Sequence, residues 1–389
     1  MCKDLIIVLL EGHRKIKSNS IKVALVHYWL INMRGGEKVL EGLCELFPQA
    51  DIFTHVYDPD AMSAVIRRHK VTTSFIQKLP MALKKYQSYL PLMPLALEQF
   101  DLRDYDLVIS SESGPAKGVI TRPDALHVCY CHTPMRYVWD MYHDYLENAG
   151  KFTKLMMPLM IHYLRNWDLA TASRVDHFIA NSAYVAKRIE KHYRRAAEVI
   201  HPPVDINSFV VSSVHDDFYL MVGQLVRYKR ADIAVAAFNQ SGKKLIIIGD
   251  GAQLSDLKRN AKSNVTLMGH QPFSVIKDHY SRCKALIFPG VEDFGIVPVE
   301  AMASGRPVIA LRKGGALETV RGGLSGLFFD QQTPDSLNEA VEYFEKKEAD
   351  FSPEAIVEHA RLFDKTIFKE NIMEFIQSKM AIMRSGQES

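Results

Sequence analysis

Short apolar runs recur along the first half of the chain, separated by polar and helix-like segments. They lie at residues 21–26, 51–54, 107–110, 127–130 and 177–180. Short apolar runs bounded by loops are typical of buried parallel strands. After the first run a helix is expected to begin near Gly36, because apolar residues then recur at helical spacing at Val39, Leu40, Leu43, Leu46 and Phe47. Alternating strands and helices predict a doubly wound α/β domain over residues 21–200.

A proline pair interrupts this pattern. Pro202 and Pro203 stop a helix and favour extended backbone, so residues 199–205 are predicted to link two domains. A second series of apolar runs follows at residues 218–222, 244–248, 265–268, 285–288 and 307–310. It predicts a second doubly wound domain over residues 201–365, with a ligand-binding cleft between the two. Residues 1–20 read as an N-terminal extension, and residues 366–389 contain a final helix.

Length and composition agree with two soluble domains. A chain of 389 residues is too long for one ordinary core, and 47% hydrophobic with 24% charged residues exclude a disordered chain. The net charge of +3 is unevenly spread, since residues 1–200 hold 26 Lys and Arg against 21 Asp and Glu. This basic half could face an anionic membrane or a phosphorylated acceptor, and a solvated surface with chance asymmetry explains it equally well. No nucleic-acid partner is expected.

The cysteines and the apolar runs indicate in which cell compartment the protein is expected. Five cysteines form no paired framework, and Cys129 and Cys131 are too close for a CxxC motif, which favours reduced thiols in the cytoplasm. The run at residues 5–10 is a poor signal peptide, and no run is long enough to span a bilayer. We expect a cytoplasmic protein, at most peripheral on the inner face of the cytoplasmic membrane.

Residues 291–310 carry the strongest candidate site. Two acids, Glu292 and Glu300, stand on either side of Phe294, Gly295 and Ile296, between one predicted strand and the helix that follows it. Such a unit places loop amides and a helix N-terminus at the carboxyl edge of a parallel sheet, where anionic ligands bind. Glycine at position 295 allows the backbone to approach that ligand closely.

Each domain has a candidate phosphate loop after its first strand. Gly35 and Gly36 open the first helix, where exposed amides and the helix dipole favour a phosphate; a tight turn that needs positive φ is the alternative. In the second domain, Arg227, Lys229 and Arg230 follow the first strand and suit a diphosphate. A solvated basic loop is the alternative there.

A further candidate is the segment CHTPMRY at residues 131–137, which follows a predicted strand end. His132 lies at the predicted cleft edge, where an imidazole can donate or accept a hydrogen bond. A lone histidine is more often structural than catalytic. Arg136 could meet an acceptor or a phosphate, or brace the loop, and Tyr137 is a second acceptor candidate.

Together these segments resemble the retaining glycosyltransferases of family four, which have the GT-B fold. Glu292 and Glu300 match the family's E-x7-E signature, and the Gly35-Gly36 loop resembles its N-domain glycine loop. The HTPMRY segment resembles mannosyltransferases that build bacterial O-antigen and exopolysaccharide. The resemblance implies two Rossmann-like domains, a cleft between them and a C-terminal helix that crosses back to the first domain.

The resemblance also implies roles for the candidate residues. Glu300 would bind the nucleotide ribose, and Glu292 with the amides of residues 294–296 would hold sugar hydroxyls. His132 would support charge at the anomeric carbon, while Lys229 and the amides of residues 35–36 would bind the donor diphosphate. Gln224 stands where the family usually has an arginine, so that contact is missing or is made by Arg227 or Arg230.

The implied activity is transfer of a hexose, mannose from GDP-mannose, to a lipid-linked glycan in lipopolysaccharide biosynthesis. No cofactor is expected besides this donor, and the lack of an isolated Asp-x-Asp pair or a metal-spaced His/Cys cluster predicts a reaction without a metal ion. A nucleotide-sugar epimerase of the same fold and a non-catalytic nucleotide-sugar-binding subunit are the alternatives.

Two segments combine basic and apolar residues, at 79–102 and 151–167. Each could lie on a membrane surface, with its apolar side in the lipid and its basic side towards the headgroups. Core-facing helices interrupted by prolines are the alternative, which the sequence slightly favours.

Overall fold

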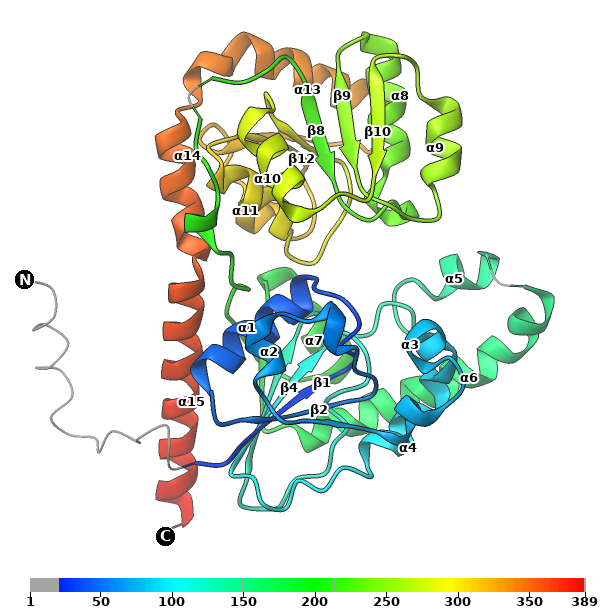
Figure 1. Ribbon diagram of the computed structural model, residues 1–389, viewed down its shortest axis with the longest axis vertical. Helices are drawn as coiled ribbons and strands as arrows, with labels where there is room; N and C mark the ends of the chain where they lie inside the picture. Colours follow the sequence, from blue (N-terminus) through cyan, green and yellow to red (C-terminus); the bar gives the residue numbers. More distant parts are fainter. Residues whose placement is uncertain (1–20, 149, 213, 388–389) are drawn as a thin grey trace, which may run out of the picture.

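The computed structural model describes residues 21–387 apart from residues 149 and 213, so the predicted extension at residues 1–20 lies outside the described part of the chain. Within that part, the chain forms two parallel-sheet α/β domains, one above the other in Figure 1. This confirms the predicted fold class. Both sheets place their first strand between the second and the fourth, which is the doubly wound Rossmann order.

The first domain is built on a seven-stranded sheet in the order β3-β2-β1-β4-β5-β6-β7. Its central strands β1, β4 and β5 are buried along their whole length, because helices cover both faces. The strands are β1 (Val23–His27), β2 (Asp51–Thr54), β3 (Val71–Thr73), β4 (Leu107–Glu112), β5 (Leu126–Cys131), β6 (His177–Ala180) and β7 (Ala197–Val199). The helices are α1 (Gly35–Leu46), α2 (Ala64–Arg67), α3 (Ala82–Lys85), α4 (Met93–Leu97), α5 (Tyr142–Asn148), α6 (Lys151–Thr171) and α7 (Ala183–Tyr193), with the 3-10 turn η4 (Tyr86–Leu92) between α3 and α4.

The second domain repeats this plan with a six-stranded sheet in the order β10-β9-β8-β11-β12-β13. The strands are β8 (Tyr219–Val222), β9 (Leu245–Ile248), β10 (Val265–Gly269), β11 (Leu286–Phe288), β12 (Val308–Leu311) and β13 (Gly326–Phe329). The helices are α8 (Ala231–Ser241), α9 (Leu254–Asn260), α10 (Phe273–Arg282), α11 (Ile296–Ala303), α12 (Ala316–Thr319), α13 (Pro334–Lys347), α14 (Pro353–Ala360) and α15 (Lys365–Gln387).

Helix α15 leaves the second domain and runs along the first (Figure 1). Its apolar side enters the core of the first domain, where Phe368, Ile372 and Phe375 join the cluster that contains Val39 and Leu43 of α1. The helix therefore ties the two domains together.

Strands β3, β7 and β13 were missed by the sequence pattern. All three are the outermost or near-edge strands of their sheets, and β3 and β7 have no fully buried residue. The half-solvated strands β3 and β7 have no continuous apolar run, so their sequences do not stand out from loops. This reason does not apply to β13, which contains the apolar residues 327–329.

Candidate active site between the two domains

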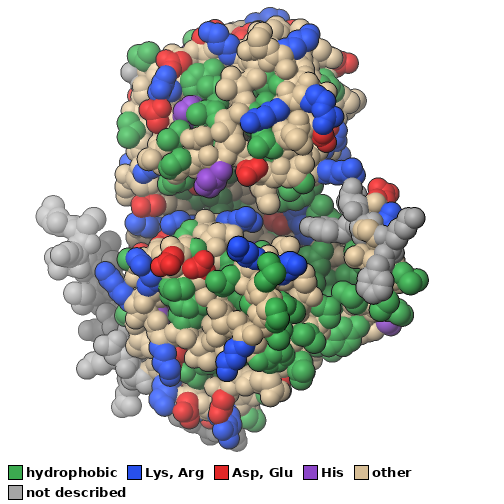
Figure 2. Space-filling view, turned by 45° about the vertical axis from the view of Figure 1, so that its right-hand side comes forward, with side chains coloured by type: hydrophobic (Ala, Val, Ile, Leu, Met, Phe, Trp, Pro, Cys, Tyr) green, Lys and Arg blue, Asp and Glu red, His purple; other side chains and the backbone are tan. Residues whose placement is uncertain are grey.

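A cleft of about 1140 Å³ separates the two domains where the carboxyl ends of their strands face each other. Figure 2 shows the groove, with Lys and Arg side chains gathered along it. Its walls include all of the candidate site residues except Arg227 and Arg230. The candidates that line it are Gly35, Gly36, His132, Arg136, Tyr137, Lys229, Glu292, Phe294, Gly295, Ile296 and Glu300. Residues up to 265 positions apart in the sequence, Gly35 of α1 and Glu300 of α11, thus line one cavity.

On the second domain, the loop after β11 and the start of α11 form one wall. Gly295 is the N-cap of α11 and has a φ of 91°, a left-handed conformation that favours glycine. The Lys229 ammonium lies 3.0 Å from the Glu292 carboxylate. Burial opposes the charged form of Lys229, but Glu292 outweighs it and the pKa of Lys229 is raised. Lys229 is therefore held at the wall of the cleft by an ion pair with Glu292.

Glu300 projects from α11 into the cleft and accepts a hydrogen bond of 2.8 Å from the Tyr280 hydroxyl. Burial raises the pKa of Glu300 to about 7, although the Tyr280 bond and the charge of Lys229 act in the opposite direction. The carboxyl can therefore change its charge near neutral pH. Tyr280 was not among the residues predicted from the sequence, because it lies on α10 with no motif around it.

On the first domain, Gly35 and Gly36 at the start of α1 matter because they have no Cβ atom, not because their backbone needs a positive φ. Their φ angles are not positive, so the turn alternative does not explain them. A Cβ atom at Gly36 would lie 2.2 Å from the Tyr28 hydroxyl, and one at Gly35 would lie 2.8 Å from Ile296 of the other domain. Small residues here let the N-terminus of α1 approach the opposite wall of the cleft.

The basic loop after β8 divides into residues that face the cleft and residues that do not. Lys229 lines the cleft, whereas Arg227 and Gln224 are exposed and lie outside its walls. The Arg230 guanidinium forms an ion pair with the Asp232 carboxylate, at 3.0 Å. In this arrangement neither Arg227 nor Arg230 lines the cleft.

Arg136 takes part in a bridge between the domains. Its guanidinium lies 2.7 Å from the Asp293 carboxylate, which also accepts a bond of 2.9 Å from Arg188 of α7. The Ser182 hydroxyl donates to the Asp293 carbonyl at 2.6 Å. The contacts of Arg136 in this structure therefore brace its loop, which is one of the three roles considered for it.

A second bridge lies beside the first. Glu318 of α12 accepts hydrogen bonds from the backbone N–H groups of Ala183 and Tyr184, at 2.7 and 3.0 Å, and so caps helix α7 of the other domain. A carboxylate at a helix N-terminus is favoured by the helix dipole. We call these contacts of Asp293 and Glu318 with the first domain the interdomain bridge.

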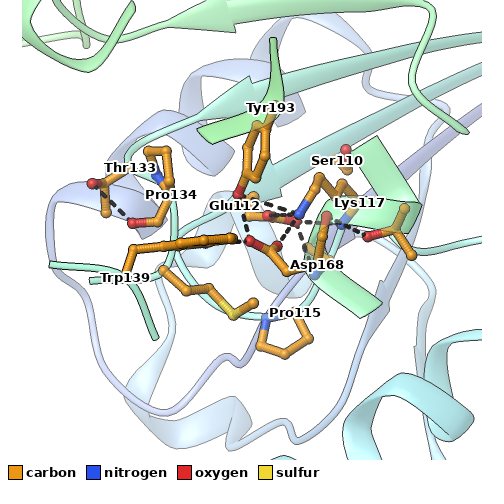
Figure 3. Close-up of polar contacts among 12 residues, drawn as sticks. Ser110, Glu112, Pro115, Lys117, Thr133, Pro134, Trp139, Asp168 and Tyr193 are labelled. Atoms are coloured by element: carbon orange, nitrogen blue, oxygen red, sulfur yellow. Dashed lines mark hydrogen bonds and ion pairs between the residues drawn. The ribbon is translucent and has the colours of Figure 1, made fainter. Parts of the chain in front are cut away.

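The loop that carries His132 rests on a buried ionic cluster, drawn in Figure 3. Lys117 is fully buried between Glu112, at 2.7 Å, and Asp168. Trp139 and Tyr193 donate to the same Asp168 carboxylate, at 2.7 and 2.9 Å. The Glu112 carbonyl in turn accepts a 2.8 Å bond from the backbone N–H of His132. These bonds hold the His132 loop against the sheet.

The interdomain bridge makes a testable prediction. For the donor that the sequence resemblance implies, the double variant Asp293→Asn, Glu318→Gln is expected to raise the KM by about 10- to 100-fold, the range for losing one charge-assisted hydrogen bond. The melting temperature should change little, because each domain keeps its own core. Steady-state kinetics would measure the change in KM, and thermal denaturation would measure the melting temperature. The control is Glu345→Gln, which removes a carboxylate bonded to Lys243 and Tyr219 within the second domain; an equal KM change there would contradict a role for the bridge.

Two family models match successive parts of the chain. The model "Glycosyltransferase Family 4" matches residues 33–208, and "Glycosyl transferases group 1" matches residues 206–363. They meet at the linker and together cover most of both domains.

Curated relatives match at modest identity. An uncharacterised glycosyltransferase of Methanocaldococcus jannaschii is 31% identical over 172 residues, which is 43% of this chain and 48% of that protein. The O-antigen chain mannosyltransferase C of Escherichia coli is 24% identical over 288 residues, 68% of this chain and 71% of that protein. For the first relatives, the matched part of this chain spans about half of their length.

Solved structures show the same fold. HepE of Anabaena, crystallised in complex with UDP, superposes with a TM-score of 0.69 at 17% identity, over 92% of this chain and all of that one. WaaG, a glycosyltransferase involved in lipopolysaccharide biosynthesis, superposes with a TM-score of 0.65 at 14% identity, over 91% and 99% of the two chains. The chain belongs to the family-four glycosyltransferases, and its two facing Rossmann-like domains form a GT-B fold.

Proposed function

We propose that this protein is a retaining glycosyltransferase that moves mannose from GDP-mannose to a lipid-linked glycan in O-antigen biosynthesis. The observation that carries the proposal is the meeting of Lys229, Glu292 and Glu300 with Gly36 and His132 across one cleft. The named activities of two similar proteins, the O-antigen chain mannosyltransferase C and an alpha-1,3/1,6-mannosyltransferase of Neurospora crassa, support mannose as the sugar. The UDP-glucose bound by HepE supports a nucleotide-sugar donor in general.

In this proposal the donor diphosphate lies between Lys229 and the amides at Gly35 and Gly36. Glu292 then exchanges its ion pair with Lys229 for hydroxyls of the sugar. The bond between the anomeric carbon and the phosphate oxygen breaks, and the bond to the acceptor oxygen forms on the same face. The acceptor proton passes to the departing phosphate, so no protein nucleophile is needed. Lys229 and the N-terminal amides of α11 stabilise the charge of the leaving group, which would make a metal ion unnecessary.

The N-terminal domain has an apolar and basic surface that suits the membrane where such an acceptor lies. In α6, Leu155 and Leu159 are 73% and 69% exposed, although the sequence favoured a core-facing segment. Ile161 and Leu164 on its other side are buried and pack against Leu90 of η4, so α6 and the α3–η4 segment adjoin. The exposed lysines of this surface are Lys84, Lys85 and Lys154. Within the described residues no helix is both long and apolar enough to cross a membrane.

Replacing both exposed leucines is expected to weaken membrane binding. In Leu155→Asp, Leu159→Asp the binding to vesicles of anionic phospholipid should fall by about 10-fold or more, because two leucine side chains no longer enter the lipid. Vesicle co-sedimentation measures this. Leu362→Asp, at a leucine of the second domain that is 58% exposed, is the matched control and should bind like the wild type. Equal loss in both variants would contradict this surface.

Incubation with a panel of nucleotide-sugars and a mannosylated lipid-mimic acceptor tests the proposal. GDP-mannose should raise the melting temperature more than UDP-glucose does, since a bound donor stabilises the folded state by mass action. Mannose should then appear on the acceptor. Epimerisation of the donor, or tight donor binding with no transfer, would overturn the proposal in favour of an epimerase or a non-catalytic subunit.

A further inference from the structure

Three adjacent strands of the first domain bring a row of polar side chains to the edge of the cleft. Strand β1 ends at His27, β4 contains Ser111, and His132 follows β5. The sheet register pairs His27 directly with Ser111. The Ser111 hydroxyl oxygen lies 3.0 Å from Nδ1 of His27 and 2.8 Å from Nε2 of His132. One buried hydroxyl thus joins the two rings.

The row continues to the start of α1. Nε2 of His27 is buried without a hydrogen-bond partner, and the group that faces it is the Glu37 carboxylate, at 3.8 Å. His27 and Glu37 are 0% and 1% exposed. The other oxygen of Glu37 accepts a bond of 2.9 Å from the backbone N–H of Arg34, just before the two glycines. A continuous line of polar groups therefore runs from the candidate phosphate loop to His132.

We propose that Glu37, His27 and Ser111 are positioning residues that fix which ring nitrogen of His132 carries its proton. A carboxylate next to Nε2 of His27 favours a hydrogen on that nitrogen, which leaves Nδ1 of a neutral ring as an acceptor. The Ser111 hydroxyl then donates to His27 and accepts from Nε2 of His132. His132 consequently has its hydrogen on Nε2, and its bare Nδ1 is the ring nitrogen left for a ligand in the cleft.

The protonation of His132 agrees with this order. Burial lowers the pKa of His132 to about 3, so its ring is neutral at pH 7 and has a single N–H. A bare Nδ1 accepts a hydrogen bond from a hydroxyl, whereas an N–H there would donate one. This part of the inference rests on the proposed function. A hydroxyl of the donor sugar near the anomeric carbon donates its hydrogen to Nδ1 of His132. The hydroxyl oxygen then keeps electron density while positive charge develops at the anomeric carbon.

The tautomer of His132 in the wild-type protein tests the inference before any donor is added. Nitrogen-15 NMR of histidine-labelled protein distinguishes a bare ring nitrogen from a protonated one, and the His132 signals are assigned by their loss in His132→Gln. We expect the hydrogen on Nε2 of both His27 and His132. A hydrogen on Nδ1 of His132 would overturn the inference, whatever the protein's activity proves to be.

Two variants test the line itself. Glu37→Gln keeps an oxygen for the Arg34 amide but presents an N–H₂ group to His27, so the hydrogens should reverse and Nδ1 of His132 should become protonated. Ser111→Ala breaks the line and should leave the His132 tautomer mixed. In both variants kcat for transfer is expected to fall by roughly 10- to 100-fold, the usual effect of removing a residue that orients a functional side chain. The KM for the donor should change less than about 3-fold.

Ser110→Ala is the matched control. Ser110 is as buried as Ser111 and bonds a buried histidine in the same way, His127 at 2.9 Å, but has no contact with His132. It should lose a similar amount of stability while keeping the His132 tautomer and kcat. If Ser110→Ala lowered kcat as much as Ser111→Ala, or if Glu37→Gln left the His132 tautomer unchanged, the inference would be wrong. If the tautomers are as expected but no variant or wild type transfers mannose, the proposed function fails and the inference about His132 stands.

Discussion

Replacing Lys229 with methionine is expected to lower kcat/KM for mannose transfer by roughly 1000-fold, the effect of removing one preorganised group that stabilises a leaving oxyanion. Of the three cations in the loop after β8, Lys229 is the one that lines the cleft, since Arg227 is exposed and Arg230 pairs with Asp232. Gln224 supplies no charge in place of the family arginine. The diphosphate should therefore depend on Lys229 more than it would with two cations beside it. Steady-state kinetics with GDP-mannose measures the loss.

Two companion variants separate charge from folding. Lys229→Met leaves Glu292 without its partner at 3.0 Å, so the double variant Lys229→Met, Glu292→Gln should recover stability but not activity. Glu292→Gln alone should bind free GDP more tightly, because the carboxylate no longer competes for Lys229, and should still transfer mannose poorly. If Lys229→Met kept more than about a tenth of the wild-type kcat/KM, the diphosphate would have another main partner.

Replacing Glu300 with glutamine is expected to weaken GDP-mannose binding by about 10- to 100-fold at pH 8, since ribose hydroxyls bond a carboxylate more strongly than an amide. In the wild type the affinity should rise by about 10-fold between pH 6 and pH 8. The reason is that the pKa of Glu300 is raised to about 7, so that most carboxyls are neutral at pH 6 and must lose a proton to bind the ribose in the charged form. Calorimetric titration at several pH values measures both effects.

The stability of the free protein should change with pH in the opposite direction. Because the folded-state pKa of Glu300 is raised above its ordinary value of 4.5, its contribution to stability is complete below pH 4.5 and is lost as pH rises through about 7. Glu300→Gln should remove this part of the pH dependence of the melting temperature. Tyr280→Phe removes a bond that favours the carboxylate, so it should shift the midpoint of the binding profile to higher pH. An unchanged pH profile in Glu300→Gln would show that another group titrates.

The sequence predicted the central part of the fold well. The buried strands β1, β5, β6, β9 and β11 appeared as continuous apolar runs, because helices cover both faces of each sheet. Strands β3 and β7 were missed because their residues are partly solvated at the sheet edge and their patterns resemble loops.

The walls of the cleft were predicted from motifs, but its supports were not. Glu292, Glu300 and Lys229 lie beside glycines and strand ends, which is a local signal. Arg188 meets Asp293 from a helix 105 positions away, and nothing in the sequence of α7 marks that contact. Ser111 lies just after the predicted strand at residues 107–110, and its role depends on register with β1 and β5, which a single sequence does not specify.

The most direct test of the central claim is the configuration of the glycosidic bond that the protein forms. The wild type would be incubated with GDP-α-mannose and the lipid-mimic acceptor, with Lys229→Met as the inactive control. The one-bond NMR coupling between the anomeric carbon and its hydrogen would give the configuration of the product. Transfer on the same face of the sugar predicts an α-linked product and one GDP released for each bond formed. A β-linked product, or unchanged acceptor with GDP-mannose bound in the cleft, would contradict the account.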